Sequence, residues 1–381
     1  MARHHPSHPV TVPPGSWPPA VGEAAPWFTC RTGKRERFAF DTIAGRYIVL
    51  TFLGSAAEPA GARFLERILA VRARFDDRHV SFFGVSTDPD DELSGRIADM
   101  IPGLRYFRDH DRAVSGRYGA VGAEGKYRRI TYLLDPSLRV LAIIPFTGDG
   151  DLHATELLAR LDRLPAVPAS QPAALQAPVL VLPRIFEPEF CRRLVDYYQM
   201  HGSEDSGFML DVDGTTRAAL DYSHKRRRDC TIEDRDLQEA CMARIRRRLV
   251  PEIHKAFQFQ VTRMERCIVA CYDAADQGHF RPHRDNTTSG TAHRRFAVSL
   301  FLNSGEYEGG FLRFPEYGPA LYSAPLGGAV VFSCSVLHEA TPVTHGLRYM
   351  FLPFLYDEPA RQIREQNLRF VDVGPIGGAS S

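Results

Sequence analysis

Apolar runs separated by helical segments fill the first half of the chain, between about residues 22 and 164. The pattern predicts, in chain order, a strand at 46–54, a helix at 62–75, a strand at 80–88, a helix at 91–100, a hairpin from 127–135 and 139–146, and a helix at 153–164. Strands that alternate with helices in this way indicate an α/β layer fold, with helices packed on a sheet.

The second half has a different pattern. A short strand and a helix that begins at Glu187–Pro188 are predicted within 179–202, and residues 233–259 form a periodic stretch that predicts one long helix. Further on, short strands bounded by glycine alternate between two faces, for example in RFAVSLFLN at 295–303. Short, evenly spaced strands of this kind suit a double-stranded β-helix, the jelly roll of cupins.

These patterns divide the 381 residues into two domains, as the length also favours. The segment 165–178 is rich in Pro and Ala and lacks periodicity, which is typical of a linker. The expected organisation is a disordered tail at 1–20, an α/β thioredoxin-like domain at 21–164, the linker at 165–178, a mainly-β jelly-roll domain with supporting helices at 179–358, and a C-terminal tail at 359–381.

Composition excludes some classes of protein. The net charge is only +1, so nothing in the overall charge favours a nucleic-acid or membrane binder. No apolar run approaches the length of a membrane-spanning helix, and the N-terminus lacks the apolar core of a signal peptide. Seven cysteines without CxxC spacing are typical of reduced thiols, and we therefore expect a cytoplasmic protein.

Candidate chemistry is concentrated late in the chain. His283 and Asp285 are two residues apart, so their side chains would share one face of an extended strand. His338 lies in a second β-like run, and Arg348 follows it by ten residues. Two imidazoles and one carboxylate form the facial triad that suits non-haem Fe(II) and oxygen chemistry. An arginine close to such a metal can grip a carboxylate in two places.

The segment from about residue 178 to 357 resembles the iron- and 2-oxoglutarate-dependent dioxygenases, in particular the prolyl-4-hydroxylase-like branch. The resemblance rests on the HxD, the later His and the Arg, together with YDAADQGHFRPHRD, the Leu302–Asn303 pair and PLGGAVVF at 325–332. Prolyl hydroxylases proper usually carry Lys where this chain has Arg348. That difference leaves co-substrate binding as expected and makes collagen-type prolyl substrates a poorer expectation.

The resemblance implies a role for each matching residue. The implied iron ligands are His283, Asp285 and His338, and Arg348 would bind the distal carboxylate of 2-oxoglutarate with help from Tyr272. Asn303 is expected to face the pocket and contact substrate or iron-bound water. The implied reaction is hydroxylation of an aliphatic C–H with release of succinate and CO₂. It uses Fe(II), 2-oxoglutarate and O₂, and ascorbate is an additional candidate cofactor.

The first domain resembles the thioredoxin-fold peroxiredoxins of the AhpC/TSA type. GEAAPWF, RYIVLTFLG, GVSTDP and DHDRAVSGRYGA occur in the order of that family. Glu58 stands where the family's threonine belongs, and Gly61 stands where its peroxidatic cysteine belongs. Peroxidase chemistry needs a thiolate, so we expect this domain to be catalytically inactive and to serve docking, substrate presentation or formation of a homodimer.

Several alternatives remain open at this point. The jelly roll could be a cupin-like metal enzyme that does not use 2-oxoglutarate, or the chain could be a non-enzymatic docking protein; a nucleic-acid demethylase is less expected because the net charge is near zero. The substrate could be a small molecule, a free amino acid or a peptide. The basic stretch at 224–229 is a candidate grip for an acidic substrate, whereas the arginines at 244–249 are interpreted as a solvated helix face. His279, His293 and His345 are interpreted as loop or supporting residues.

Overall fold

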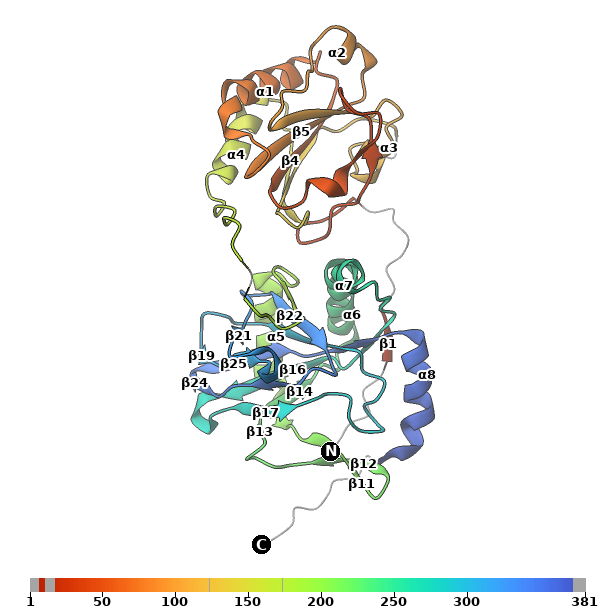
Figure 1. Ribbon diagram of the computed structural model, residues 1–381, viewed down its shortest axis with the longest axis vertical. Helices are drawn as coiled ribbons and strands as arrows, with labels where there is room; N and C mark the ends of the chain where they lie inside the picture. Colours follow the sequence, from red (N-terminus) through yellow and green to blue (C-terminus); the bar gives the residue numbers. More distant parts are fainter. Residues whose placement is uncertain (1–6, 11–17, 123, 173, 373–381) are drawn as a thin grey trace. The chain divides into compact units, whose positions relative to one another are not determined.

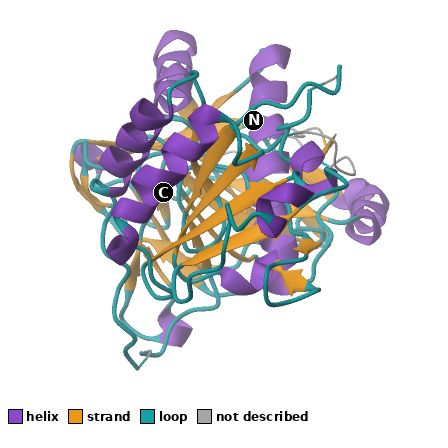
Figure 2. Ribbon diagram, turned by 90° about the horizontal axis from the view of Figure 1, so that it is seen from above, coloured by secondary structure: helices purple, strands orange, loops and turns teal. Residues whose placement is uncertain are grey.

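The computed structural model describes residues 7–10, 18–122, 124–172 and 174–372. The chain forms two compact units (Figure 1), one of Pro13–Gln171 and one of Met1–Val12 with Pro172–Ser381. The two-domain fold class predicted from the sequence is confirmed, because the first unit is an α/β layer structure and the second is a mainly-β double sheet with helices. Figure 2 distinguishes helices from strands by colour.

The first unit is built on a mixed sheet with strand order β6-β5-β4-β7-β8. The strands are β4 (Tyr47–Gly54), β5 (Val80–Ser86), β6 (Leu104–Arg108), β7 (Ile130–Leu134) and β8 (Val140–Pro145). β4, β5 and β6 run parallel, while β7 pairs antiparallel with β4 and β8, so the predicted hairpin is confirmed. Helices α1 (Pro59–Ala70) and α4 (Gly150–Leu161) share one apolar core with the sheet, and α3 (Ala113–Arg117) contributes to a second core.

The predicted helices of this unit differ from the observed ones at their ends. α1 begins at Pro59, three residues earlier than predicted, because a proline is tolerated at the first helical position. The helix predicted at 91–100 is only the short α2 (Pro89–Leu93). Gly95 ends it by adopting a positive φ of 70°, which suits glycine and not a continuing helix.

The second unit contains a large and a small sheet. Within the described residues the large sheet has ten strands, with β1-β15-β26-β18-β25-β16-β14-β10 in order and β22 and β9 added at β18. Its strands are β1 (Ser7–Pro9), β9 (Leu180–Leu182), β10 (Glu204–Asp205), β14 (Arg228–Thr231), β15 (Arg263–Glu265), β16 (Ile268–Asp273), β18 (Phe296–Phe301), β22 (Ala329–Ser333), β25 (Leu347–Phe351) and β26 (Phe354–Tyr356).

The small sheet has the order β13-β17-β23-β20-β21. Its strands are β13 (Lys225–Arg226), β17 (His279–His283), β20 (Leu312–Arg313), β21 (Leu321–Tyr322) and β23 (His338–Ala340). Shorter pairings are made by β19 (Glu308–Gly309) with β24 (Val343–His345) and by the hairpin of β11 (Phe208–Val212) and β12 (Thr215–Ala219), which β27 (Val371–Asp372) joins.

The alternation predicted for 295–303 is what separates the two cores of this unit. Val298 and Leu300 pack in an apolar core with α5 (Pro188–His201), α6 (Arg235–Arg244) and α7 (Val250–Phe257). Ala297 and Phe301 point the other way, into a core shared with the small sheet. Strand β18 is therefore covered by helices on one side and faces the inside of the jelly roll on the other.

The helix predicted at 233–259 is confirmed from Arg235 to Phe257, with a π-helical turn, Ile245–Leu249, between α6 and α7. Pro251 lies in the first turn of α7 and lacks the N–H that regular α-helical bonding needs, which accounts for the π turn. The prediction of a tail at 359–381 was wrong where it is described, because that range includes most of α8 (Glu358–Asn367), whose N-cap is Asp357; residues 373–381 lie outside the described part.

The predicted disordered tail at 1–20 was also wrong where it is described. Ser7–Pro9 form β1, which pairs antiparallel with β15, and the Ser7 hydroxyl lies 2.7 Å from the Tyr356 hydroxyl. Residues 1–6 and 11–17 lie outside the described part. No helix within the described ranges is long and apolar enough to cross a bilayer. All seven cysteines are described; none forms a disulfide, and six are buried.

Candidate active site

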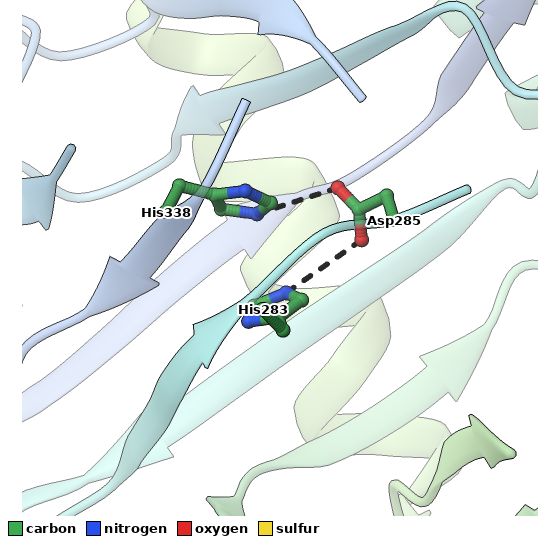
Figure 3. A group of neighbouring side chains, drawn as sticks. All are labelled: His283, Asp285 and His338. Atoms are coloured by element: carbon green, nitrogen blue, oxygen red, sulfur yellow. Dashed lines mark ion pairs between the residues drawn. The ribbon is translucent and has the colours of Figure 1, made fainter. Parts of the chain in front are cut away.

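Two neighbouring strands of the small sheet bring together the three predicted ligands (Figure 3). His283 at the end of β17 is paired in register with His338 at the start of β23. Asp285 was expected on the same strand as His283, but β17 ends at His283 and Asp285 lies in the following turn. The Asp285 N–H donates to the carbonyl of Cys334 at 3.0 Å, which fixes that turn beside β23.

The atoms of these three side chains that could bind a metal lie close to one another. His283 Nε2 lies 3.6 Å from Asp285 Oδ1, and His338 Nε2 lies 3.3 Å from Asp285 Oδ2. One ligand atom from each of the three residues lies within 4.8 Å of the others. Each Nδ1 faces a backbone carbonyl, that of Arg281 at 2.7 Å and that of Val336 at 3.0 Å. Because a carbonyl only accepts, each Nδ1 carries the proton and each Nε2 keeps its lone pair for a metal.

The electrostatics of the cluster suit a bound cation. Burial, with the nearby His338, lowers the pKa of His283 to about 4, so its imidazole is neutral at physiological pH. Burial alone would raise the pKa of Asp285, but His338 and His283 hold it well below the usual range. Two imidazole nitrogens and one carboxylate fit a divalent iron with open coordination positions.

The cluster borders a cavity of about 650 Å³ inside the jelly roll. This volume lies within the range of small-molecule sites. Tyr272, Phe332 and Ala340 line its inner wall. The β11–β12 hairpin and the C-terminal residues Leu368 and Val371 line the opposite end. A molecule in the cavity would therefore lie between the strands that carry the histidines and a covering hairpin.

Arg348 lies on β25 directly opposite Tyr272 on β16. Its Cζ is 4.9 Å from the Tyr272 ring centre and 5.3 Å from that of Phe301. Arg348 is buried, and its Nε has no hydrogen-bond partner among the described residues. Tyr272 lines the cavity, whereas Arg348 is not among the described lining residues. The predicted co-substrate roles of both residues stay predictions.

The structure does not support the pocket-facing position predicted for Asn303. Its Nδ2 donates to the carbonyl of Leu347 at 2.7 Å, and its Oδ1 accepts from the N–H of Tyr349 at 2.9 Å. Asn303 is also not among the described residues that line the cavity. The side chain thus links the end of β18 to β25 through the two residues that flank Arg348. A side-chain amide can do this because it offers both a donor and an acceptor to the backbone of a strand.

In the basic stretch at 224–229, some side chains line the cavity and others do not. Lys225 and Arg227 line the cavity, whereas Arg226 and Arg228 are not among its described lining residues. This alternation follows from the extended backbone, in which successive side chains point to opposite faces. Asp229, next on the inner face, accepts from both Nε and NH2 of Arg227 at 2.7 Å.

The remaining histidines near the motif have partners of their own. His279 contacts the carbonyls of Gln277 and Ser223, His293 pairs with Glu265, and His345 is exposed. Sequence reasoning missed two cavity residues, Arg266 and Arg294. Both lie just outside the regular strands, so no alternation could have revealed their direction.

The first unit has no thiol at the position where the family it resembles carries its peroxidatic cysteine. Gly61 lies in the first turn of α1, and Glu58, its N-cap residue, forms an ion pair with Arg129. A Cβ added at Gly61 would lie 3.8 Å from Arg129 Nε. Burial raises the pKa of Cys30, the cysteine of this unit, to about 11, so its thiol is protonated at neutral pH.

Fold and site together define an α/β domain joined to a jelly roll that carries a His–Asp–His cluster able to hold a metal ion. Residues 267–356 match the 2OG-Fe(II) oxygenase superfamily, and residues 21–143 match the AhpC/TSA family. The first match contains the His–Asp–His cluster and Arg348, and the second contains Glu58 and Gly61. The chain therefore combines a segment that matches the AhpC/TSA family with a segment that matches the 2OG-Fe(II) oxygenase superfamily, as the sequence motifs predicted.

Individual relatives cover only parts of the chain. A PKHD-type hydroxylase of Synechococcus sp. (strain JA-2-3B'a(2-13)) is 27% identical over 129 residues, which cover 31% of this chain and 53% of the relative. Human procollagen-lysine,2-oxoglutarate 5-dioxygenase 2 is 27% identical over 177 residues, covering 45% of this chain and 22% of the relative. The chain thus spans about half the length of the first relative and about a fifth of the second.

Among solved structures, a prolyl-4-hydroxylase from Pseudomonas putida is similar to the second unit. The alignment has a TM-score of 0.36 at 18% sequence identity and covers 47% of this chain and 92% of that chain.

Proposed function

We propose that the chain is an Fe(II)- and 2-oxoglutarate-dependent dioxygenase that hydroxylates an aliphatic C–H of a small molecule, an amino acid or a peptide residue. The observation that carries this proposal is the pair of imidazoles whose Nδ1 atoms are held by backbone carbonyls, with both Nε2 atoms facing Asp285. Such fixed tautomers are typical of built metal sites. When bound, Fe(II) would supply the activation of oxygen that is coupled to decarboxylation of 2-oxoglutarate.

The residues of the chain have separate tasks in this proposal. His283, Asp285 and His338 would hold the metal. Arg348 and Tyr272 would hold the distal carboxylate of 2-oxoglutarate, and the buried, unpartnered Nε of Arg348 favours this over a cupin-like enzyme without that co-substrate. The aromatic core of the inner face, with Phe332 and Phe314, would keep water from the reacting centre.

The test is an anaerobic titration with Fe(II), followed by measurement of succinate formed from 2-oxoglutarate with and without oxygen. We expect oxygen-dependent succinate in the wild type and loss of both iron binding and succinate in His283→Ala. His345→Ala is the matched control, because His345 is an exposed histidine of the same unit. A wild type that binds neither Fe(II) nor 2-oxoglutarate would overturn the proposal.

A further inference from the structure

Several cationic side chains line the cavity beside the metal-binding cluster. Among the described residues there are six of them: Lys225, Arg227, Arg266, Arg284, Arg294 and Arg364. A buried cation is costly unless a carboxylate or hydrogen-bond acceptors compensate it. The partners of each side chain therefore show which of them is left for a ligand.

Five of the six have identified partners inside the protein. Arg284 donates to Glu316 Oε1 at 2.7 Å. Arg227 is held by both oxygens of Asp229, and Arg294 donates to Glu265 Oε1 at 2.7 Å. Arg364 Nε lies 3.6 Å from the other oxygen of Glu265. The pairings with Asp229 and Glu265 use the carboxylates of this wall.

Lys225 has neutral hydrogen-bond acceptors as partners instead of a carboxylate. Its Nζ donates to the Ser206 hydroxyl at 2.7 Å and to the Gly207 carbonyl at 2.6 Å. Burial lowers the pKa of Lys225 well below its usual value, which reduces its charge.

Arg266 is the exception. It has one hydrogen bond, from NH2 to the Leu352 carbonyl at 3.2 Å, and no ion pair with any described residue. Its buried Nε has no hydrogen-bond partner in the described part of the chain. Burial, followed by repulsion from Arg227 and Arg294, lowers the pKa of Arg266 to about 10. An anion bound here would relieve this unfavourable environment.

The backbone and an aromatic ring fix the position of this guanidinium. Arg266 has a φ of 71°, a left-handed conformation that is uncommon outside glycine and concentrates at functional sites. Its Cζ lies 4.5 Å from the ring centre of Phe354, and the Cζ of Arg294 lies 3.9 Å from the same centre. Arg294 NH1 is 3.4 Å from the Asp285 carbonyl, which places this wall next to the metal-binding cluster.

We infer that Arg266 binds the carboxylate of a small organic substrate lying in the cavity beside His283, Asp285 and His338. This inference rests on the proposed function and specifies its substrate class. The carboxylate would accept from the terminal nitrogens of the guanidinium, in the two-point geometry that arginine offers. Arg348, which the proposed function assigns to the co-substrate, contacts the rings of Tyr272 and Phe301. The co-substrate and the substrate are therefore assigned to two different arginines.

The alternative substrate is a residue within a peptide. It differs from a small organic acid in the group that would meet Arg266. An internal residue presents an amide where a free acid presents a carboxylate. An unpaired buried guanidinium discriminates against the amide because an uncharged oxygen compensates its charge less well. Carboxamides of small acids therefore serve as probes for the peptide case.

The test uses the full chain loaded with Mn(II), which blocks turnover, and with saturating 2-oxoglutarate. Free L-amino acids and straight-chain monocarboxylic acids are titrated by calorimetry, each against its own carboxamide. We expect at least one acid to bind about 10- to 100-fold more tightly than its amide, the range of a charged hydrogen-bond pair. Arg266→Gln should abolish this difference, and Arg266→Lys should restore part of it.

The matched control is Arg228→Gln, which removes an exposed arginine of the neighbouring strand β14 and should leave the difference intact. Affinity for 2-oxoglutarate is measured in every variant and should not change. The inference would be overturned if no acid bound more tightly than its amide, if the difference survived in Arg266→Gln, or if that variant lost affinity for 2-oxoglutarate. Wild-type protein that fails to bind 2-oxoglutarate before any acid is added would instead overturn the proposed function.

Discussion

Tyr272 and Arg348 are cross-strand partners on β16 and β25, with the guanidinium carbon 4.9 Å from the centre of the tyrosine ring. The ring lines the cavity, and the guanidinium beside it belongs to a buried side chain. A cation in contact with a ring gains about 0.5–2 kcal/mol, which holds Arg348 in place before any ligand binds.

Replacing Arg348 with Gln should weaken binding of 2-oxoglutarate about 10- to 100-fold, because a charge-assisted two-point contact becomes a single neutral one. Binding of Fe(II) should not change, since Arg348 is not part of the metal-binding cluster. Anaerobic titration of the metal and then of 2-oxoglutarate measures both. Equal affinity for 2-oxoglutarate in variant and wild type would remove Arg348 from the site.

Gly310 provides the space that Arg348 occupies. A Cβ at this position would lie 2.5 Å from Arg348 Cδ, and the residue has a φ of 62°. Gly310→Ala should therefore displace Arg348 and reduce 2-oxoglutarate affinity as well as stability. Gly305→Ala is the control, because Gly305 also has a positive φ, of 97°, but open space around the added atom. Both variants should lose about 1–2 kcal/mol from the backbone alone, and only the first should lose affinity.

Asn303 should matter for stability and for the position of Arg348. Its amide bonds to Leu347 and Tyr349, the residues before and after Arg348. Asn303→Ala should reduce the free energy of unfolding by about 1–3 kcal/mol, since the buried N–H of Tyr349 loses its acceptor. Hydrogen exchange of peptides from β18 and β25 measures the effect. Asn286→Ala, which removes a hydrogen bond to the Ser335 hydroxyl in a more exposed turn, should have a smaller effect.

The first unit should lose stability in mild acid because of His153. This buried side chain is 2.8 Å from the Thr131 hydroxyl, and burial lowers its pKa to about 4. Between the unfolded pKa near 6.5 and the folded value the unfolded chain binds the extra proton, so stability falls as pH falls through this window and levels off below it. The loss should amount to up to about 3 kcal/mol.

Hydrogen exchange of β7 and β8 peptides between these pH values would measure that loss. In His153→Gln the pH dependence should largely disappear, while His110→Gln, at an exposed position, should retain it. An unchanged pH profile in His153→Gln would contradict the assignment.

Restoring a cysteine at Gly61 should not by itself restore a reactive thiol. Arg129 is close enough to stabilise a thiolate there, but its charge is compensated by Glu58. We expect Gly61→Cys to react slowly with iodoacetamide, and the double variant with Glu58→Thr to react faster and with a lower thiol pKa. Alkylation rates as a function of pH measure this, and the native cysteines react little because six are buried. Equal rates in the single and double variants would show that Glu58 has no such influence.

Much of the fold could be predicted because its strands have clear periodicity. In β18 the alternation of Val298 and Phe301 between two cores follows directly from the order of the side chains. The π turn at Ile245–Leu249 could not be predicted from the apolar stripe, because it preserves that stripe while changing the hydrogen bonding. The proline at 251 was the available signal.

The candidate site was predictable in its residue types and less so in its geometry. The three ligand residues converge as their spacing suggested, although Asp285 reaches the cluster from a turn. Asn303 was misplaced because a side chain at the end of a strand can bond to the neighbouring strand instead of facing the pocket. Arg266 gave no signal, since its direction depends on a left-handed backbone that no periodicity encodes.

The pairing of β1 with β15 has a consequence for the order in which the protein can be completed. Ser7 pairs with Glu265 in the same sheet, although the whole first unit lies between them in the chain. During synthesis from the N-terminus, the partner strand emerges from the ribosome long after β1, and after the first unit has been made. Within the described part of the chain, β15 is therefore covered on that side only by the N-terminal segment. A C-terminal unit expressed from Pro172 onward would leave β15 as the edge strand, open to pairing with other chains.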